Sequence, residues 1–203
     1  MTDTGASDRR PLKSRSTRWA GVAARAVLAT GLSANNVSFI GILFALGGAG
    51  AFLLADRNPW WLLAAAAGIQ LRLLANMLDG LVAVEGKRGS PTGAMWNEFP
   101  DRVEDSVLLI AAGYATPYPW AGWLAALLAA VCAYVRLLGG TLGRSQDFGG
   151  PMAKPHRMAA LTLGALAAIA WTPALLVSLA IIAAGTVLTI ALRLGRLAGA
   201  LRA

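Results

Sequence analysis

Residues 76–106 read NMLDGLVAVEGKRGSPTGAMWNEFPDRVEDS, and this stretch holds most of the acidic side chains of the 203-residue chain. Ten acidic residues are present, and six of them lie between Asp79 and Asp105. The flanking sequence is dominated by Ala, Leu, Val and Ile. An ionised group in hydrocarbon costs about 2.5–3.5 kcal/mol even on the most lenient insertion scale. These acids therefore need water, counter-ions or a metal ion, and they are candidates for a functional site.

The composition of the whole chain indicates an integral membrane protein. Hydrophobic residues make up 57% of the chain and charged residues only 14%, with a mean hydropathy of +0.58. A soluble protein of this size cannot hide so much apolar surface, whereas a bilayer solvates it. The formal charge of +8 does not indicate nucleic-acid binding, because the basic residues flank apolar segments and form no groove interleaved with aromatic side chains. We expect membrane lipids as partners, and no nucleic acid.

The apolar segments predict an all-α fold with six transmembrane helices, each of about 20 residues. An amphipathic helix over about residues 16–30, where arginines alternate with apolar side chains, is expected to precede them and to lie on the membrane surface. Residues 1–15 are predicted to form a basic tail, and residues 16–203 a single domain. The predicted spans are residues 36–55, 60–84, 92–115, 120–140, 156–171 and 174–194.

Basic residues gather on alternate connections between these spans, which predicts the orientation. The positive-inside rule places both termini and the acid-rich site in the cytosol. The three opposite connections hold a single basic residue, Arg57, and are bordered by Trp and Tyr side chains typical of a membrane interface. A bacterial cytoplasmic (inner) membrane matches this pattern. The predicted cytosolic basic residues are Arg9, Arg10, Lys13, Arg15, Arg18, Arg25, Lys87, Arg88, Arg144, Lys154, Arg157, Arg193, Arg196 and Arg202.

Helical periodicity places the polar side chains of the second and third predicted spans on two stripes. At about 100° per residue, each stripe covers one face of its helix, and a short loop between the helices predicts antiparallel neighbours whose stripes face each other. The result is a pocket of carboxylates and amides, which are hard oxygen ligands suited to Mg²⁺, Mn²⁺ or Ca²⁺. The stripes consist of Arg72, Asn76, Asp79 and Ala83 on one helix, and of Asn97, Asp101, Glu104 and Asp105 on the other.

The same stretch resembles the signature of the CDP-alcohol phosphatidyltransferase family, usually written D-x2-D-G-x2-A-R-x8-G-x3-D-x3-D. The spacing is preserved throughout, and the Asp-Gly pair, the Ala, the second Gly and the fourth Asp are matched by Asp79, Gly80, Ala83, Gly93 and Asp101. The chain departs from the signature at three positions. Asn76 and Asn97 stand at the first and third Asp, and Val84 stands at the Arg.

The resemblance implies a membrane enzyme of phospholipid synthesis that transfers a phosphatidyl or phospho-alcohol group from a CDP-linked donor to an alcohol or lipid acceptor and releases CMP. It also implies one or two Mg²⁺ or Mn²⁺ ions, a base for the acceptor hydroxyl, and a homodimer. The catalytic candidates are Asp101 and Asp105. The candidate metal ligands are Asn76, Asp79, Asn97, Asp101 and Asp105, and the candidate nucleotide-binding residues are Asp79, Gly80, Ala83 and Gly93.

Two of these assignments have simpler alternatives. Asp105 is included because it lies one helical turn beyond Asp101 and replaces charge lost at the two Asn positions, but it can instead pair with a cation such as Arg102. The small residues Gly80, Ala83 and Gly93 leave room for a bulky ligand, or they simply allow close helix packing.

Basic residues supply the expected phosphate- and acceptor-binding groups. Lys154 and Arg157 lie at a predicted helix start, where backbone N–H groups also favour phosphate; the alternative is that they only set the topology. Arg72 and Arg136 lie inside spans, so we expect them to face the pocket, either neutralising the acids or touching substrate.

Three alternatives remain for the function as a whole. One is a small cation- or proton-coupled transporter, which predicts polar residues across the full membrane depth. Another is a catalytically inactive member of the family, and a third is a scaffold protein. Within the enzyme interpretation, the donor is either CDP-diacylglycerol used with a polar alcohol, or a soluble CDP-alcohol used with diacylglycerol.

Overall fold

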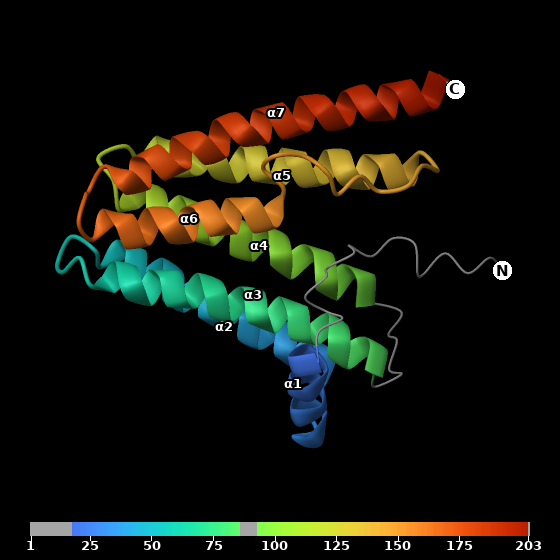
Figure 1. The fold of residues 1–203 in the computed structure, drawn as a ribbon, viewed down its shortest axis with the longest axis horizontal. Helices are drawn as coiled ribbons and strands as arrows, with labels where there is room; N and C mark the ends of the chain where they lie inside the picture. Colours follow the sequence, from blue (N-terminus) through green and yellow to red (C-terminus); the bar gives the residue numbers. More distant parts are fainter. Residues whose placement is uncertain (1–17, 86–92, 203) are drawn as a thin grey trace.

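The structure of the chain, a computed structural model, describes residues 18–85 and 93–202, and in these ranges every regular element is a helix. The predicted tail (residues 1–15) and the loop residues Lys87 and Arg88 lie outside the described residues, as do the side chains of Ala83 and Asn97 and the surroundings of Gly93. Each helix corresponds to a predicted segment, although the last one continues to Arg202, beyond its predicted end at residue 194. Figure 1 shows their arrangement. The helices are α1 (Arg18–Ala29), α2 (Ala34–Leu53), α3 (Trp61–Glu85), α4 (Gly93–Tyr114), α5 (Pro119–Thr141), α6 (Lys154–Ala168) and α7 (Ala174–Arg202).

Local sequence explains several helix ends. Ser33 caps α2, because its side-chain oxygen accepts a hydrogen bond from the backbone N–H of Asn36 at 3.2 Å. Both α5 and α6 have a proline in the first turn, where the missing N–H costs no intrahelical bond. Pro173 lies in the short connection between α6 and α7, because proline ends one helix and readily starts another.

Four helices within the described ranges are long and apolar enough to cross a membrane: α2, α3, α5 and α7. The other two predicted spans differ for separate reasons. Helix α4 carries five charged side chains between Glu98 and Asp105, and α6 has only 15 residues. Both pack inside the same bundle, α4 against α2 and α5, and α6 against α3 and α7. The membrane character of the bundle agrees with the prediction, while the number of six spans remains a prediction.

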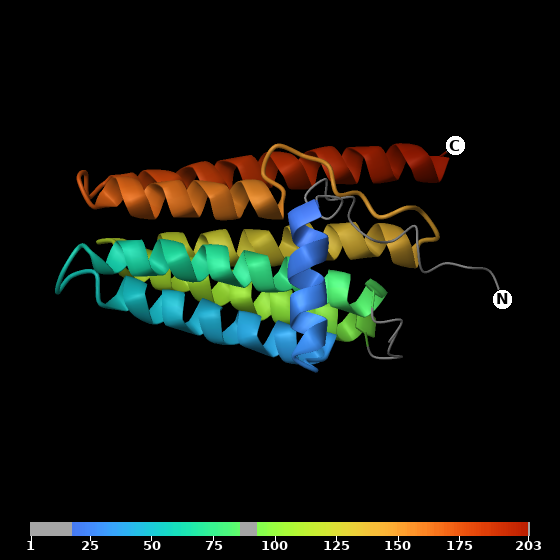
Figure 2. The ribbon, with the colours of Figure 1, turned by 60° about the horizontal axis from the view of Figure 1, so that its bottom comes forward.

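The six helices after α1 form a closed ring in the order α2, α3, α6, α7, α5 and α4. Consecutive helices α3 and α4 therefore touch at few points, contrary to the expectation that they are direct neighbours, because α2 packs against both. Their polar stripes still meet, since long side chains reach across the interior of the ring. Helix α1 contacts α3 and lies crosswise at one end of the bundle (Figures 1 and 2).

Glycines bring the helices into close contact at two crossings. A Cβ atom on Gly113 of α4 would lie 2.7 Å from the Cα atom of Gly122 of α5, and one on Gly68 of α3 would lie 2.7 Å from the Cα atom of Gly48 of α2. Such small-residue contacts are typical of helix packing in membranes, where van der Waals contact replaces the hydrophobic effect. The crossings hold α3 and α4 in place and thereby position the polar side chains that both helices carry.

Candidate functional site

A cluster of charged side chains occupies the interior of the ring. It combines residues of α3 and α4, whose stripes the sequence predicts, with residues from the start of α6. We call this set the acid cluster. Its members are Arg72, Asn76 and Asp79 of α3; Asp101, Glu104 and Asp105 of α4; and Lys154 and Arg157 of α6.

Arg72 is the centre of the cluster and is completely buried. Its Nε atom donates to Glu104 Oε2 at 2.6 Å, and its Nη2 atom donates to Asp105 Oδ1 at 2.5 Å. The same Nη2 atom lies 3.3 Å from the backbone oxygen of Asp101. Charge-assisted hydrogen bonds of this kind are stronger than neutral ones. Arg72 thus ties three positions of α4 to α3 and pairs with the acids, which is one of its two predicted roles; contact with substrate remains a prediction.

Asp105 is held by two guanidinium groups. Arg72 pairs with its Oδ1 atom, and Arg157 Nη2 lies 3.3 Å from its Oδ2 atom. Arg157 also donates to the backbone oxygen of Met152 at 3.1 Å. The contacts therefore favour the alternative in which Asp105 pairs with cations. Its metal-binding and catalytic roles, and the phosphate-binding role of Arg157, remain predictions.

Asp101 lies toward the open side of the cluster, with 19% of its side chain exposed. Its Oδ1 atom accepts a hydrogen bond from Asn76 Nδ2 at 2.5 Å and forms an ion pair with the Lys154 ammonium group. Arg102 approaches the other carboxylate oxygen at 3.6 Å. The Asn76 amide also donates to Glu104 Oε2 at 2.9 Å, so its nitrogen links two acids of α4.

Asp79 has a different environment, because it takes part in no ion pair with the described residues. It is 6% exposed, and its Oδ2 atom accepts a hydrogen bond from the Ser38 hydroxyl of α2 at 2.7 Å. Its Oδ1 atom is buried and has no hydrogen-bond partner among those residues. Ser38 is not among the predicted site residues, because its only signal in the sequence is a hydroxyl in the first turns of an apolar helix.

The described side chains contain no ready-made group of three or more His, Cys, Asp or Glu residues that could hold a metal ion. Three of the four acids are instead turned toward cations. Nevertheless, Asp79 Oδ1 and Glu104 Oε1 are buried oxygens without partners in the described part of the chain. Leaving such atoms unsatisfied is costly, and hard cations prefer this kind of ligand. Among the described side chains, the unpaired Asp79 Oδ1 atom is thus a suitable ligand for a divalent ion.

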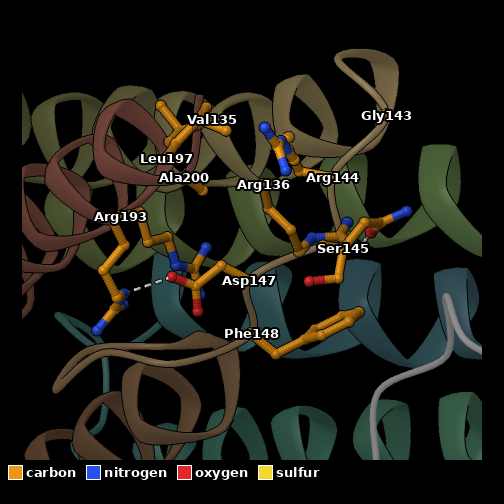
Figure 3. A pocket seen from close by; sticks show the side chains of 13 residues that line it. Val135, Arg136, Gly143, Arg144, Ser145, Asp147, Phe148, Arg193, Leu197 and Ala200 are labelled. Carbon is orange, nitrogen blue, oxygen red and sulfur yellow. Dashed lines mark hydrogen bonds and ion pairs between the residues drawn. The ribbon is translucent and has the colours of Figure 1, made fainter. Parts of the chain in front are cut away.

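A second feature is a cavity of about 720 Å³ at the same end of the bundle, between α5, α7 and the connection that joins α5 to α6 (Figure 3). We call it the arginine pocket. Its lining includes Arg136 of α5, Arg144 and Phe148 of the connection, and Arg193 and Arg196 of α7. One carboxylate, Asp147, also lines the cavity and pairs with Arg196, so the four arginines leave an excess of positive charge that attracts anions.

Internal contacts hold these arginines in place. Arg136 forms an ion pair with Glu98 of α4, donates to Gln146 Oε1 at 2.5 Å, and lies over the Phe148 ring, 5.1 Å from its centroid. Arg193 donates to the backbone oxygens of Gly149 at 2.9 Å and Cys132 at 3.0 Å. Because these partners are neutral, they do not cancel the charge of Arg193.

The connection between α5 and α6 closes the arginine pocket by folding against α7. Gly150 adopts a φ of +124°, and a Cβ atom there would lie 2.4 Å from Thr189 of α7, so only glycine fits. The Thr189 hydroxyl also accepts a hydrogen bond from the backbone N–H of Met152 at 2.9 Å. Of the four predicted phosphate-binding residues, only Arg136 lies in this pocket. The other three arginines, Arg144, Arg193 and Arg196, were predicted only to set the membrane topology.

Comparison with known proteins gives no match to any protein-family model and none to a curated protein sequence. The structure is, however, similar to solved structures of phosphatidylinositol phosphate synthase from Mycobacterium tuberculosis. In its complex with manganese and citrate, that protein aligns with a TM-score of 0.77 and 25% identity over 88% of each chain. With CDP-DAG bound, it aligns with a TM-score of 0.75 and 24% identity over 89% of this chain and 94% of that one. This chain therefore shares its fold with a CDP-alcohol phosphatidyltransferase.

Proposed function

We propose that this chain is a membrane enzyme that transfers the phosphatidyl group of CDP-diacylglycerol to the hydroxyl group of a polar alcohol and releases CMP. The observation that carries the proposal is the fold, which is similar to that of the synthase and carries Asp79 on α3 and Asp101 on α4 at the spacing of the family signature. That synthase was solved with CDP-DAG bound, which favours this donor over a soluble CDP-alcohol.

Asp79 would hold Mg²⁺ or Mn²⁺, with the Asp101 carboxylate and the amide oxygens of Asn76 and Asn97 as further candidate ligands. When bound, the ion neutralises charge on the diphosphate of the donor. Asp79 is the best-supported ligand, because its Oδ1 atom has no partner among the described residues. Gly80, Ala83 and Gly93 remain the candidates for close approach by the nucleotide.

Asp101 is the better candidate for the base. It is partly exposed, whereas both oxygens of Asp105 are occupied by guanidinium groups. In the proposed reaction, the acceptor hydroxyl oxygen forms a bond to the phosphorus of the phosphatidyl group, and its proton passes to the Asp101 carboxylate. The bond from that phosphorus to CMP breaks, and CMP leaves with the electron pair. Asp105 would act through Arg72, by keeping α4 in position.

The arginine pocket supports an acceptor alcohol that carries a negatively charged group such as a phosphate. It lies next to the acid cluster along α4, since Arg136 pairs with Glu98, about one helical turn before Asp101. The planar guanidinium group of arginine can donate two parallel hydrogen bonds to a phosphate or carboxylate group. A charged acceptor held there would have its hydroxyl group directed toward the cluster. Arg157 and Lys154 remain candidates for the donor phosphates.

The proposed membrane setting follows the sequence prediction. It comprises six spans in one domain over residues 16–203, with α1 at the membrane surface and the acid cluster facing the cytosol from the inner membrane. The crosswise position of α1 at the end that carries the arginine pocket supports an interfacial location (Figure 2). A homodimer is part of the proposal.

The direct test is a calorimetric titration of CMP into the purified protein with and without Mn²⁺, followed by CMP release from CDP-diacylglycerol with a panel of alcohols. We expect Mn²⁺-dependent CMP binding that is lost in Asp79→Asn and kept in Asp56→Asn, which changes an exposed acid between α2 and α3. Absence of CMP binding by the wild type under both conditions would refute the enzyme proposal and favour a transporter or an inactive family member.

The acceptor assignment has its own test. Arg144 is exposed on the connection and lines the pocket, so Arg144→Met should raise the KM for a phosphorylated alcohol several-fold while leaving CMP affinity unchanged. Arg57→Met, at an exposed arginine between α2 and α3, is the matched control. Equal KM values for the two variants would remove the pocket from the acceptor site.

A further inference from the structure

The acid cluster contains its own counter-ions. Its four carboxylates share the interior with one ammonium and two guanidinium groups, each of which forms an ion pair with at least one carboxylate. The acids are Asp79, Asp101, Glu104 and Asp105, and the cations are Arg72, Lys154 and Arg157. The formal charge of the set is thus close to zero before any metal ion binds. A site built to take up two divalent ions would need several uncompensated negative charges.

Among the carboxylates of the acid cluster, Asp101 has its negative charge balanced by an ammonium group. Lys154 reaches Asp101 Oδ1 from the start of α6, and the same oxygen accepts a hydrogen bond from Asn76 Nδ2. Position 76 carries Asp in the family signature; a second carboxylate there would repel Asp101. Asn supplies an N–H donor in its place. Asp101 is therefore already surrounded by positive charge and hydrogen-bond donors that belong to the protein.

The negative charge of Asp79, in contrast, is not balanced by a cation of the described residues. It pairs with none of the described cations, and its buried Oδ1 atom lacks a hydrogen-bond partner. The Ser38 hydroxyl holds the other oxygen, so the carboxylate is oriented but not neutralised. Since buried carboxylates are normally paired or bound to metal, Asp79 retains capacity for an external cation.

We propose that the site takes up a single divalent cation, at Asp79, and that Lys154 serves as the fixed counter-ion of Asp101 where a second cation would otherwise bind. This inference rests on the proposed function and specifies its metal requirement. A second divalent ion at Asp101 would have to displace Lys154 and would stand beside Arg72, whose Nη2 atom lies 3.7 Å from Asp101 Oδ1. Repulsion between like charges is strong in a buried site of low dielectric constant.

The test is the number of Mn²⁺ ions bound per chain, measured by electron paramagnetic resonance from the loss of the free-ion signal, in the presence of CMP. We expect one ion for the wild type and one for Lys154→Arg, which keeps the cation. The double variant Lys154→Met/Asn76→Asp should bind two. Arg196→Met, which removes an exposed cation outside the cluster, should remain at one. Size-exclusion chromatography checks that each variant is folded.

Two ions in the wild type would overturn the inference, as would none, or an unchanged single ion in the folded double variant. If the double variant does not fold, the single variant Lys154→Met decides the question, because its Asp101 loses the fixed ammonium group. An unchanged number of bound Mn²⁺ ions together with an unchanged Mn²⁺ affinity would then overturn the inference.

The assay of CMP release separates this result from the proposed function. An enzyme that releases CMP but binds two ions contradicts only the inference, whereas one that binds a single ion and releases no CMP contradicts only the function.

Discussion

Replacing Arg72 by Met tests how the acid cluster holds the bundle together. The substitution removes the hydrogen bonds at 2.6 Å to Glu104 and at 2.5 Å to Asp105. Afterwards Glu104 keeps the Asn76 amide at 2.9 Å, and Asp105 keeps Arg157 at 3.3 Å. Because both carboxylates are buried, removing their shared partner should cost about 3–5 kcal/mol of unfolding free energy. That cost corresponds to a factor between about 100 and 4,000 in the unfolding equilibrium.

The assay is unfolding in mixed detergent micelles with increasing dodecyl sulfate, followed by far-UV circular dichroism. Arg196→Met is the matched control, since Arg196 pairs with Asp147 at 2.7 Å but is about half exposed; exposed pairs contribute about 1 kcal/mol or less. Adding Glu104→Gln to Arg72→Met should recover part of the loss, because it removes one uncompensated charge. If Arg72→Met costs no more than Arg196→Met, the reasoning about the buried network is wrong.

Two further predictions concern single contacts. Ser38→Ala removes the hydroxyl that orients Asp79 and should weaken Mn²⁺ binding about 10- to 100-fold, as measured by the Mn²⁺ resonance titration. Ser38→Thr should restore the binding. Unchanged Mn²⁺ affinity in the alanine variant would contradict the orienting role of Ser38. Gly113→Ala would place a Cβ atom 2.7 Å from Gly122 Cα and should destabilise the bundle by about 1–3 kcal/mol in detergent unfolding. Gly47→Ala, where nothing lies within 4 Å, should not destabilise it, and equal stabilities would show that the crossing tolerates a methyl group.

Helix positions were predictable from the sequence because apolar runs and turn residues are local signals. The seven helices correspond to the predicted segments, apart from the extension of α7 to Arg202, and side chains of the polar stripes of α3 and α4 are in contact. Which helices are neighbours was not predictable in the same way. Arg157 pairs with Asp105 across 52 positions of sequence, and no periodicity within one helix reveals that α6 packs beside α3. The interpretation of Asp105 therefore depended on a contact that only the tertiary structure shows.

The arginine pocket could not be predicted for a related reason. Its wall is an irregular connection whose path depends on the positive φ of Gly150 and on the contact with Thr189. In the sequence, these arginines flank apolar segments, as do the basic residues that set membrane topology. They are Arg144, Arg193 and Arg196. Only the folding of the connection against α7 brings them around one cavity. Ser38 was missed because a single hydroxyl in an apolar helix is compatible with ordinary packing.

The ion pair between Arg136 and Glu98 joins the arginine pocket to the helix that carries Asp101. An anion that draws Arg136 away from Glu98 leaves a carboxylate without its partner about one turn before Asp101 on α4. The local potential at the cation site then becomes more negative. Linkage makes this effect reciprocal: the anion raises the affinity for the cation by the same factor by which the cation raises the affinity for the anion. Under the proposed function, the two sites would be positively cooperative through this salt bridge, so that binding at either one would raise the affinity of the other.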